Sequence, residues 1–581
     1  MASAIPRIAP PDGRPVSLPR PLPPSEAAQI RRIFALQARG DIPAALRATA
    51  RMDSGTALGG AMLGHILAER YLGPFTRPDA DQLRDWLDRW PDLSDARAVH
   101  RLLVVRMPSG KTAPLVSGIA FIDDDRAATR VLEETEPEAT ALRRDPALDR
   151  SVWNAARVRG LAAVERLLRR GVAPAYAGQL RGEAARILFT LNRDDEAYDL
   201  AAGDVHGCGP GAASTCARAA LAGYVAGLAA WRADRFEAAR TMFQAAWRAE
   251  VTTPALQAGA AYWTARTYLR TGDVAGALPW LVRAADQRRT FYGLLARRAM
   301  GLPLGPSRVG PGERETLGEA DLDAVAATSQ GLRAFALLQV EQPERAAAEL
   351  RGLWTAAKAS RPLARALMLV AEQAGLSDLA VQFADLLAAA DGRPREGMRF
   401  PLPHLRPAHG FSVDPAMVYG LARTESNFDS ALVSSAGARG LLQIMPETAS
   451  FIVGRANSGD LPDQLYDPGV NLDLGQRYMA YLSTHDAVNG DLLRLLAAYN
   501  AGPANFARWA SLIRDNGDPL LFIEAIPIDE TRAHVPRVLT YTWMYAARLR
   551  LPASGLDELA AGRWPRYHPF DETRVLASSL H

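Results

Sequence analysis

A short pattern of turn followed by helix recurs along much of this 581-residue chain. The fragments ARGDIPAAL (38–46), RADRFEAAR (232–240) and RTGDVAGAL (270–278) each place a turn where a second helix begins, and AGLSDLAVQFADLL (374–387) is a looser copy. A period of about 34–40 residues is typical of helical hairpins that stack into a solenoid. Because the copies are irregular, we expect a curved superhelix rather than a regular array.

Small side chains favour close packing of these hairpins. From about residue 26 to 390 the chain is dominated by alanine, leucine and arginine at helical spacing, and strand-like alternation is scarce. Ala239 and Ala277 allow the paired helices to approach closely. The concave surface of such a superhelix offers a place to hold a polymer or a partner, without chemistry of its own.

The length and charge of the chain restrict its class. At 581 residues it is too long for one ordinary core, so we expect two or three domains. The net charge of +3 is small for this length and does not indicate a nucleic-acid binder. No apolar run approaches the roughly 20 residues of a membrane span.

Proline and glycine mark the boundaries between predicted segments. They interrupt the helical pattern near 389–412, in AADGRPREGMRFPLPHLRPAHGFS, and the sequence that follows is richer in tyrosine and asparagine. The proline-rich start has no apolar core and is not a secretory signal as written. We expect a flexible arm at 1–25, an α-superhelical domain at 26–320, a helical linker domain at 321–400, a compact domain at 401–555 and a tail at 556–581.

The two cysteines, Cys208 and Cys216, lie in one glycine-rich loop, HGCGPGAASTC. They are either two unrelated thiols or a small disulfide loop, which an exported protein would favour. A metal site would need more ligands than the nearby His206 supplies.

One predicted helix carries a glutamate on its apolar face. In DPAMVYGLARTESNF (414–428), Asp414 can cap the helix and Pro415 suits its first position. At about 100° per residue, Glu425 falls close to Val418, Leu421, Ala422 and Phe428, with Ala416 and Gly420 on the far side. Burial penalises the charged form of a carboxyl group. Glu425 is therefore either a structural ion-pair partner, or water-exposed at an early helix end, or an acid that keeps its proton in a functional site.

Three further stretches place polar groups beside turns. In SSAGARGLLQIMPETAS (434–450), Gln443 is the polar group among apolar neighbours, and its amide either bonds to its own loop or binds a sugar. In DLLRLLAAYNAGPANFARWA (491–510), Tyr499 precedes the break between two helices and is either a core tyrosine or a binding group. EAIPIDETRAHVPRVLTYTWMY (524–545) places Glu524 before a proline and begins a further helix.

Together, the ordered motifs ESNF, SSAGARGLLQIMP, AAYNAGP and EAIPIDETRAHV resemble the catalytic domain of the soluble lytic transglycosylases, goose-lysozyme-like enzymes that act on bacterial peptidoglycan. The resemblance covers about 405–550, and FYGLLARRAMG (291–301) also looks like a family stretch. It implies an all-α dominated fold, in which an N-terminal α-superhelical, TPR-like solenoid precedes a lysozyme-like, mostly α, α+β catalytic domain.

The resemblance also assigns roles to individual residues. It implies that Glu425 is the single catalytic acid. It implies a glycan cleft lined by Ser434, Gln443, Met445, Tyr499, Asn500, Glu524 and Tyr541. The sequence departs from the family pattern at Leu442, where methionine is frequent, and at His534, where tyrosine is usual. Pro536 lies inside the expected final helix, where we expect it to cause a kink.

A single acid suffices when the substrate supplies its own nucleophile. Glycosidases ordinarily use two carboxyl groups, but Asp429 and Glu447 are better explained as a turn residue and a first-turn residue of a helix. The resemblance implies that Glu425 protonates the bond between N-acetylmuramic acid and N-acetylglucosamine, and that the C6 hydroxyl closes a 1,6-anhydro ring without water. Two alternatives are a hydrolytic muramidase acting on the same bond and a non-catalytic, glycan-binding solenoid adaptor.

The same resemblance predicts the molecular context. We expect peptidoglycan glycan strands as the ligand, no nucleic acid, no metal and no organic cofactor. Partners in cell-wall synthesis or remodelling would bind through the superhelical domain. We expect a periplasmic location because of the substrate. No signal in the sequence indicates it.

Overall fold

The computed structural model describes residues 16–52, 55–107, 142–169, 171–207, 214–304, 315–393, 395, 397–403, 405–454 and 461–570. Across these ranges the chain is built mainly from helices, and the strands are the short antiparallel pair β1 (Val205–Gly207) and β2 (Thr215–Ala217). The prediction of an all-α dominated fold is therefore confirmed.

The chain forms two compact units, and each unit joins two separate stretches of sequence. The first combines Met1–Arg130 with Val309–His404, and the second combines Val131–Arg308 with Leu405–His581. The sequence analysis divided the chain into consecutive segments, 26–320 and 321–400. It did not predict that distant stretches join in one unit.

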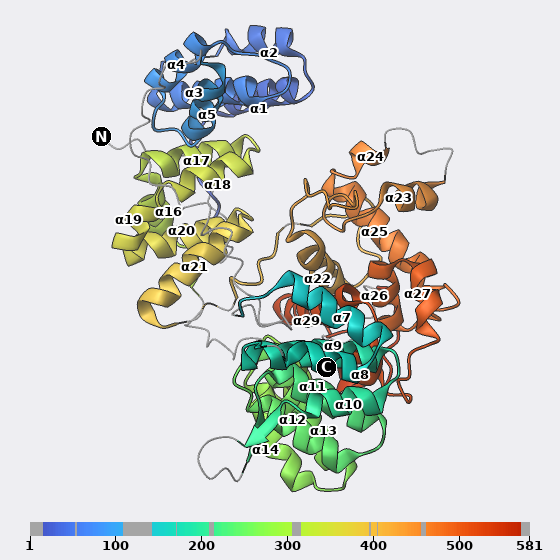
Figure 1. Ribbon diagram of the computed structural model, residues 1–581. Coiled ribbons are helices and arrows are strands. Elements are labelled where there is room, and N and C mark those ends of the chain that lie inside the picture. Colours follow the sequence, from blue (N-terminus) through green and yellow to red (C-terminus); the bar gives the residue numbers. More distant parts are fainter. Residues whose placement is uncertain are drawn as a thin grey trace, which may run out of the picture. The chain divides into compact units, whose positions relative to one another are not determined.

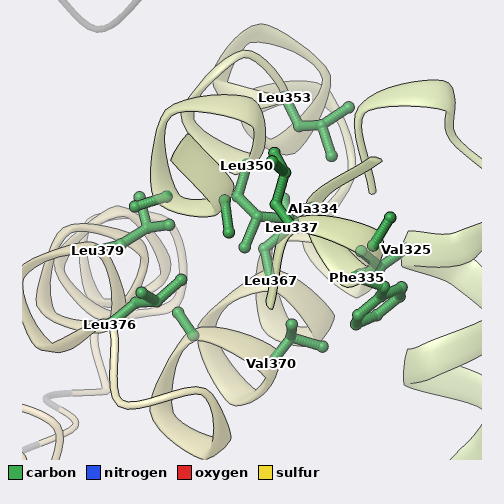
Figure 2. Packing of buried hydrophobic residues seen from close by; sticks show 14 of the residues in the cluster. Val325, Ala334, Phe335, Leu337, Leu350, Leu353, Leu367, Val370, Leu376 and Leu379 are labelled. Carbon is green, nitrogen blue, oxygen red and sulfur yellow. The ribbon is translucent and has the colours of Figure 1, made fainter. Parts of the chain in front are cut away.

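The first unit has one main core that both of its stretches share. Ile30 and Phe34 from the beginning of the chain belong to the same buried cluster as Phe335 and Leu367. Figure 2 shows the second stretch of this core, where leucine, valine and phenylalanine side chains from several helices converge. Its helices are α1 (Pro24–Ala38), α2 (Ile42–Thr49), α3 (Ala57–Leu72), α4 (Ala80–Arg89), α5 (Ala96–Arg106), α16 (Glu319–Ala326), α17 (Ser329–Gln339), α18 (Pro343–Arg351), α19 (Trp354–Ala359), α20 (Arg361–Gln373) and α21 (Ser377–Asp391).

The first stretch of the second unit is a stack of helical hairpins, drawn from teal to green in Figure 1. Consecutive helices α11 to α14 pack side by side, and α15 contacts the C-terminal helices of the same unit. The helices of this stretch are α7 (Pro146–Val158), α8 (Leu161–Leu168), α9 (Pro174–Thr190), α10 (Asp194–Ala202), α11 (Ala220–Arg232), α12 (Phe236–Trp247), α13 (Pro254–Arg270), α14 (Val274–Ala285) and α15 (Phe291–Ala299).

The second stretch of this unit is a compact helical domain in which two helices, α22 and α29, pack against each other along their length. Helix α26 also packs against α29, so α29 is central to the domain (Figure 1). The helices are α22 (Pro415–Ser426), α23 (Pro446–Val453), α24 (Leu461–Gln464), α25 (Pro468–Ser483), α26 (Leu492–Ala501), α27 (Pro503–Ala510), α28 (Pro519–Ala525), α29 (Asp529–Leu549) and α30 (Leu556–Ala560).

One turn geometry recurs in the helical hairpins of both units. Two residues before the second helix of a pair, the backbone has a positive φ at Gly40 (78°), Asn192 (59°), Asp234 (57°), Gly272 (82°), Glu341 (62°) and Gly375 (73°). Glycine, asparagine and aspartate adopt this left-handed conformation more easily than other residues. The turns predicted at 38–46, 232–240, 270–278 and 374–387 are confirmed, and each contains one of these positions.

Gly272→Ala tests this turn directly. No atom lies within 4 Å of an added Cβ and φ is 82°, so the expected cost comes from the backbone alone. We expect a loss of about 1 kcal/mol in the free energy of unfolding, measured by chemical denaturation of the full chain. Gly272→Asn is the matched control, because Asn192 occupies the same turn position, and it should lose less. An alanine variant as stable as the parent would contradict this explanation.

Candidate active site

Glu425 lies in the last turn of α22. The Asp414 carboxylate caps the beginning of the helix, as predicted, by accepting a hydrogen bond from the backbone of Ala416 at 2.9 Å. Asn427 and Phe428 both have a positive φ, 52° and 67°, so the chain turns away directly after the helix. The Glu425 side chain is 16% exposed, which leaves its carboxyl group shielded but still accessible from solvent.

The buried surface of α22 is wider than the one-sided stripe predicted by the helical wheel. Ala416 and Gly420, expected on the far side, are both buried. A Cβ on Gly420 would lie 2.6 Å from Thr542 Oγ1 of α29, so glycine is what allows the two helices to pack this closely. Both sides of α22 are buried because α29, as well as the apolar core, covers the helix.

Helix α29 supplies the hydrogen-bond partner of Glu425. Nε2 of His534 lies 2.8 Å from Glu425 Oε1, and the histidine side chain is 5% exposed. The ring of Tyr499 is nearly parallel to the imidazole, with an interplanar angle of 7° and 6.4 Å between centroids. The helix continues through Pro536. The sequence marked His534 as a departure from the family pattern but did not predict its contact with Glu425.

Tyr499 connects the acid to the neighbouring loop. Its hydroxyl donates a hydrogen bond to the carbonyl oxygen of Leu442 at 2.8 Å. Burial first, and the negative charge of Glu425 second, raise the pKa of the Tyr499 phenol well above its usual range. Tyr499 therefore remains a neutral donor and is both a core tyrosine and a neighbour of the acid.

The loop 432–445 is held in place by Asn471, a fully buried residue of α25. Its side chain accepts a hydrogen bond from Leu442 N at 2.8 Å and donates one to Leu465 O at 2.9 Å. Gly440 has a φ of 75°, and a Cβ there would lie 2.3 Å from Leu465 O, so the loop needs glycine at this point. Sequence reasoning missed Asn471, whose signal is an amide among the apolar positions of a helix.

Three of the predicted binding side chains form hydrogen bonds within this domain. Gln443 Nε2 donates to the carbonyl oxygen of Gly440 at 2.8 Å, which is the local alternative considered for it. The Ser434 hydroxyl accepts a hydrogen bond from a backbone N–H of its own turn at 3.0 Å. Oδ1 of Asn500 accepts a hydrogen bond from Thr531 Oγ1 at 2.6 Å. These contacts fix the orientations of the three side chains.

Two other predicted residues differ in burial. Met445 is half-buried at the residue before α23. Tyr541 is 3% exposed and lies two helical turns after His534 on the same face of α29. Tyr541 is therefore a core residue beneath this face.

Glu524 is surrounded by residues of the hairpin stack. Its carboxylate accepts hydrogen bonds from Arg186 Nη1 at 2.9 Å, Tyr224 OH at 2.6 Å and Tyr292 OH at 2.7 Å. These residues belong to α9, α11 and α15. Glu524 therefore fastens the C-terminal domain to the hairpin stack, at one wall of a cavity of about 720 Å³ that α28 and α29 also line.

The other carboxyl groups considered as partners of Glu425 have local roles. Asp429 is exposed and accepts a hydrogen bond from Ala431 N at 2.8 Å in the turn after α22. Glu447 is exposed in the first turn of α23. Both positions agree with the turn and first-turn roles expected from the sequence.

A cluster of potential metal ligands lies outside this domain. Ligand atoms of His206, Cys216 and Glu250 are all within 4.8 Å of one another. Cys216 is bonded in a disulfide, so its sulfur is not available as a thiolate ligand. The other cysteine, Cys208, lies outside the described residues. We therefore do not assign a metal site to this cluster.

The domain that holds Glu425 matches a known family. Residues 405–520 match the Transglycosylase SLT domain family. Over 153 residues the chain is 34% identical to the soluble lytic murein transglycosylases of Salmonella typhimurium and Escherichia coli. This similarity covers 25% of the chain and 23% of each relative, so less than a quarter of each relative's length is matched. The chain therefore contains a transglycosylase SLT domain.

The fold of the chain is similar to that of a lytic transglycosylase of known structure. The crystal structure of an inactive mutant of the lytic transglycosylase Slt from Pseudomonas aeruginosa aligns over 95% of this chain and 90% of that chain. The TM-score is 0.50 and the sequence identity is 20%, so this likeness concerns the fold alone. No helix in the described part of the chain has the length and apolar character needed to cross a membrane.

Asp491 makes the stability of this domain dependent on pH. It is 6% exposed and caps α26, the helix of Tyr499, by accepting a hydrogen bond from Arg494 N at 2.9 Å. Burial raises the pKa of its carboxyl group to about 6. The folded state therefore binds this proton more tightly than the unfolded chain, and stability is lost as the pH rises from about 4 through 6.

Asp491→Asn should remove this penalty, because asparagine also caps helices and carries no charge. At pH 8 we expect the variant to be more stable than the parent by up to about 3 kcal/mol, and near pH 4 we expect little difference. Thermal unfolding of both proteins at the two pH values measures this. A stability difference that is the same at pH 4 and pH 8 would contradict a buried, titrating Asp491.

Proposed function

We propose that this protein is a lytic transglycosylase of peptidoglycan. It cleaves the β-1,4 bond between N-acetylmuramic acid and N-acetylglucosamine and leaves 1,6-anhydromuramyl ends. The observation that carries the proposal is the placement of Glu425, a shielded carboxyl group at a helix end within the SLT domain, hydrogen-bonded to His534.

The reaction needs one group that first gives and then takes a proton. Glu425 protonates the glycosidic oxygen, the bond to the muramyl C1 breaks, and its electron pair leaves with that oxygen. The carbonyl oxygen of the neighbouring N-acetyl group stabilises the positive charge at C1, as in substrate-assisted glycosidases. The Glu425 carboxylate then takes the proton from the C6 hydroxyl as O6 bonds to C1. The acid is regenerated, and no water is consumed.

The environment of Glu425 supports this cycle. The contact with His534 holds the Glu425 carboxyl group in one orientation. An intramolecular hydroxyl has a high effective concentration, which favours ring closure over attack by water. Asp429 and Glu447 are engaged in local roles, so a two-carboxyl mechanism has less support in this domain.

The similar proteins support the same reaction. The relatives from Salmonella typhimurium and Escherichia coli are soluble lytic murein transglycosylases, and each is 34% identical to this chain over 153 residues. The similar structure from Pseudomonas aeruginosa is an inactive mutant in which glutamate is changed to glutamine. By analogy, one glutamate is essential here as well, and Glu425 is our assignment.

The remaining predictions complete the proposal. Ser434, Gln443, Met445 and Asn500 are assigned to the glycan cleft with Tyr499, Tyr541 to the core beneath it, and Glu524 to binding at its border with the hairpin stack. The superhelical segments position a long glycan strand and offer a surface to cell-wall synthesis or remodelling partners. A periplasmic site of action follows from the substrate.

Glu425→Gln tests the proposal. The amide keeps the size of the side chain but cannot donate or accept the travelling proton in the same way, so we expect release of muropeptides from purified sacculi to fall at least about 1,000-fold. Mass spectrometry of the parent's products should show 1,6-anhydromuramyl ends. Glu447→Gln is the matched control, because Glu447 is an exposed glutamate of the same domain. It should keep most of the parental rate.

Two results would contradict the proposal. Parental activity in Glu425→Gln would show that another group is the acid. Products that carry only hydrolysed, reducing muramyl ends would show that the enzyme is a muramidase, even if Glu425 is essential.

A further inference from the structure

The two ring nitrogens of His534 have different surroundings, which indicate which of them carries the proton. Nε2 lies 2.8 Å from Glu425 Oε1, while Nδ1, on the other side of the ring, is buried and has no hydrogen-bond partner among the described residues. A neutral imidazole carries one N–H and one bare acceptor nitrogen. In the neutral form of His534 this N–H is on Nδ1 or on Nε2, and the surroundings discriminate between these two tautomers.

A proton on Nδ1 would leave a buried N–H donor without an acceptor. Unpaired buried N–H groups are rare and cost more than unfilled acceptor positions. A proton on Nε2 pairs the donor with the Glu425 carboxyl group and leaves only an unfilled acceptor at Nδ1. The surroundings therefore favour the tautomer in which Nε2–H points at Glu425 Oε1.

We propose that His534 is a positioning residue that donates its Nε2–H to Glu425 Oε1 and thereby leaves Oε2 to carry the travelling proton. This inference rests on the proposed function of Glu425. When Oε2 gives its proton to the glycosidic oxygen, the negative charge spreads onto Oε1, where the imidazole N–H already points. A hydrogen bond to a charged acceptor is about twice as strong as a neutral one. The donor therefore favours the ionised step more than the resting acid.

The ring is held in place before the reaction begins. His534 is 5% exposed, and its imidazole lies nearly parallel to the ring of Tyr499 at 6.4 Å between centroids. Tyr499 is itself fixed through its hydrogen bond to the Leu442 carbonyl. A donor held in place in this way needs no reorganisation when charge develops on Glu425, which is the condition for electrostatic stabilisation of a transition state.

Three substitutions of His534 separate donation from packing. His534→Phe keeps an aromatic ring but removes the donor, and we expect kcat to fall roughly 10- to 100-fold with KM changed less than about threefold. His534→Gln and His534→Tyr each restore a donor, an amide N–H or a phenol, and should keep kcat within about fivefold of the parent. Rates are measured on soluble glycan strands over a range of concentrations, with thermal unfolding of each variant as the check on folding.

The outcomes distinguish this inference from the proposed function. If the folded Phe variant keeps the parental kcat, or if the Gln and Tyr variants fall as far as the Phe variant, donation by His534 is overturned. Both results leave the role of Glu425 intact as long as the parent releases 1,6-anhydromuramyl products and Glu425→Gln does not. If the parent itself fails to release those products, the proposed function fails instead.

Discussion

The close packing of α22 on α29 is the constraint on which the site depends. Gly420 has no side chain where Thr542 approaches, so the two helices meet closely enough to face each other at their functional ends. Glu425 then lies at the end of α22 and His534 on α29, 2.8 Å apart. A left-handed turn at Asn427 and Phe428 ends α22 directly after the acid and keeps it accessible. Chemistry at Glu425 thus depends on a contact more than 100 residues away in the sequence.

The same unit combines this domain with the hairpin stack through buried polar contacts. Glu524 is bonded by an arginine and two tyrosines of the stack, and Arg266 pairs with Asp518 at 2.8 Å. Truncating one partner of such a buried set leaves a charge without compensation, which is strongly destabilising. These contacts hold α28 and its cap on the stack, and α29, the helix that carries His534, packs against α28 and against α15 of the stack. The stack therefore supports the site.

The sequence predicted local features better than long-range ones. Glycine marked the turns at Gly40, Gly272 and Gly375, and the recurring fragment also marked the turn at Asp234, but the equivalent turns at Asn192 and Glu341 were missed. The cap and boundaries of the Glu425 helix followed from short-range rules. The contact of His534 with Glu425 and the hydrogen bonds of Asn471 to Leu442 and Leu465 join distant segments, which periodicity cannot show. The pairing of the two stretches in each unit was missed for the same reason.

The central claim is that one acid and the substrate's own hydroxyl complete the reaction without water. The most direct measurement is digestion of purified sacculi in water enriched with heavy oxygen, followed by mass spectrometry of the new muramyl ends. Ring closure by the C6 hydroxyl predicts unlabelled ends that lack the mass of one water. Incorporation of heavy oxygen at those ends, in proportion to the bonds cleaved, would contradict the account and show that the enzyme hydrolyses the bond.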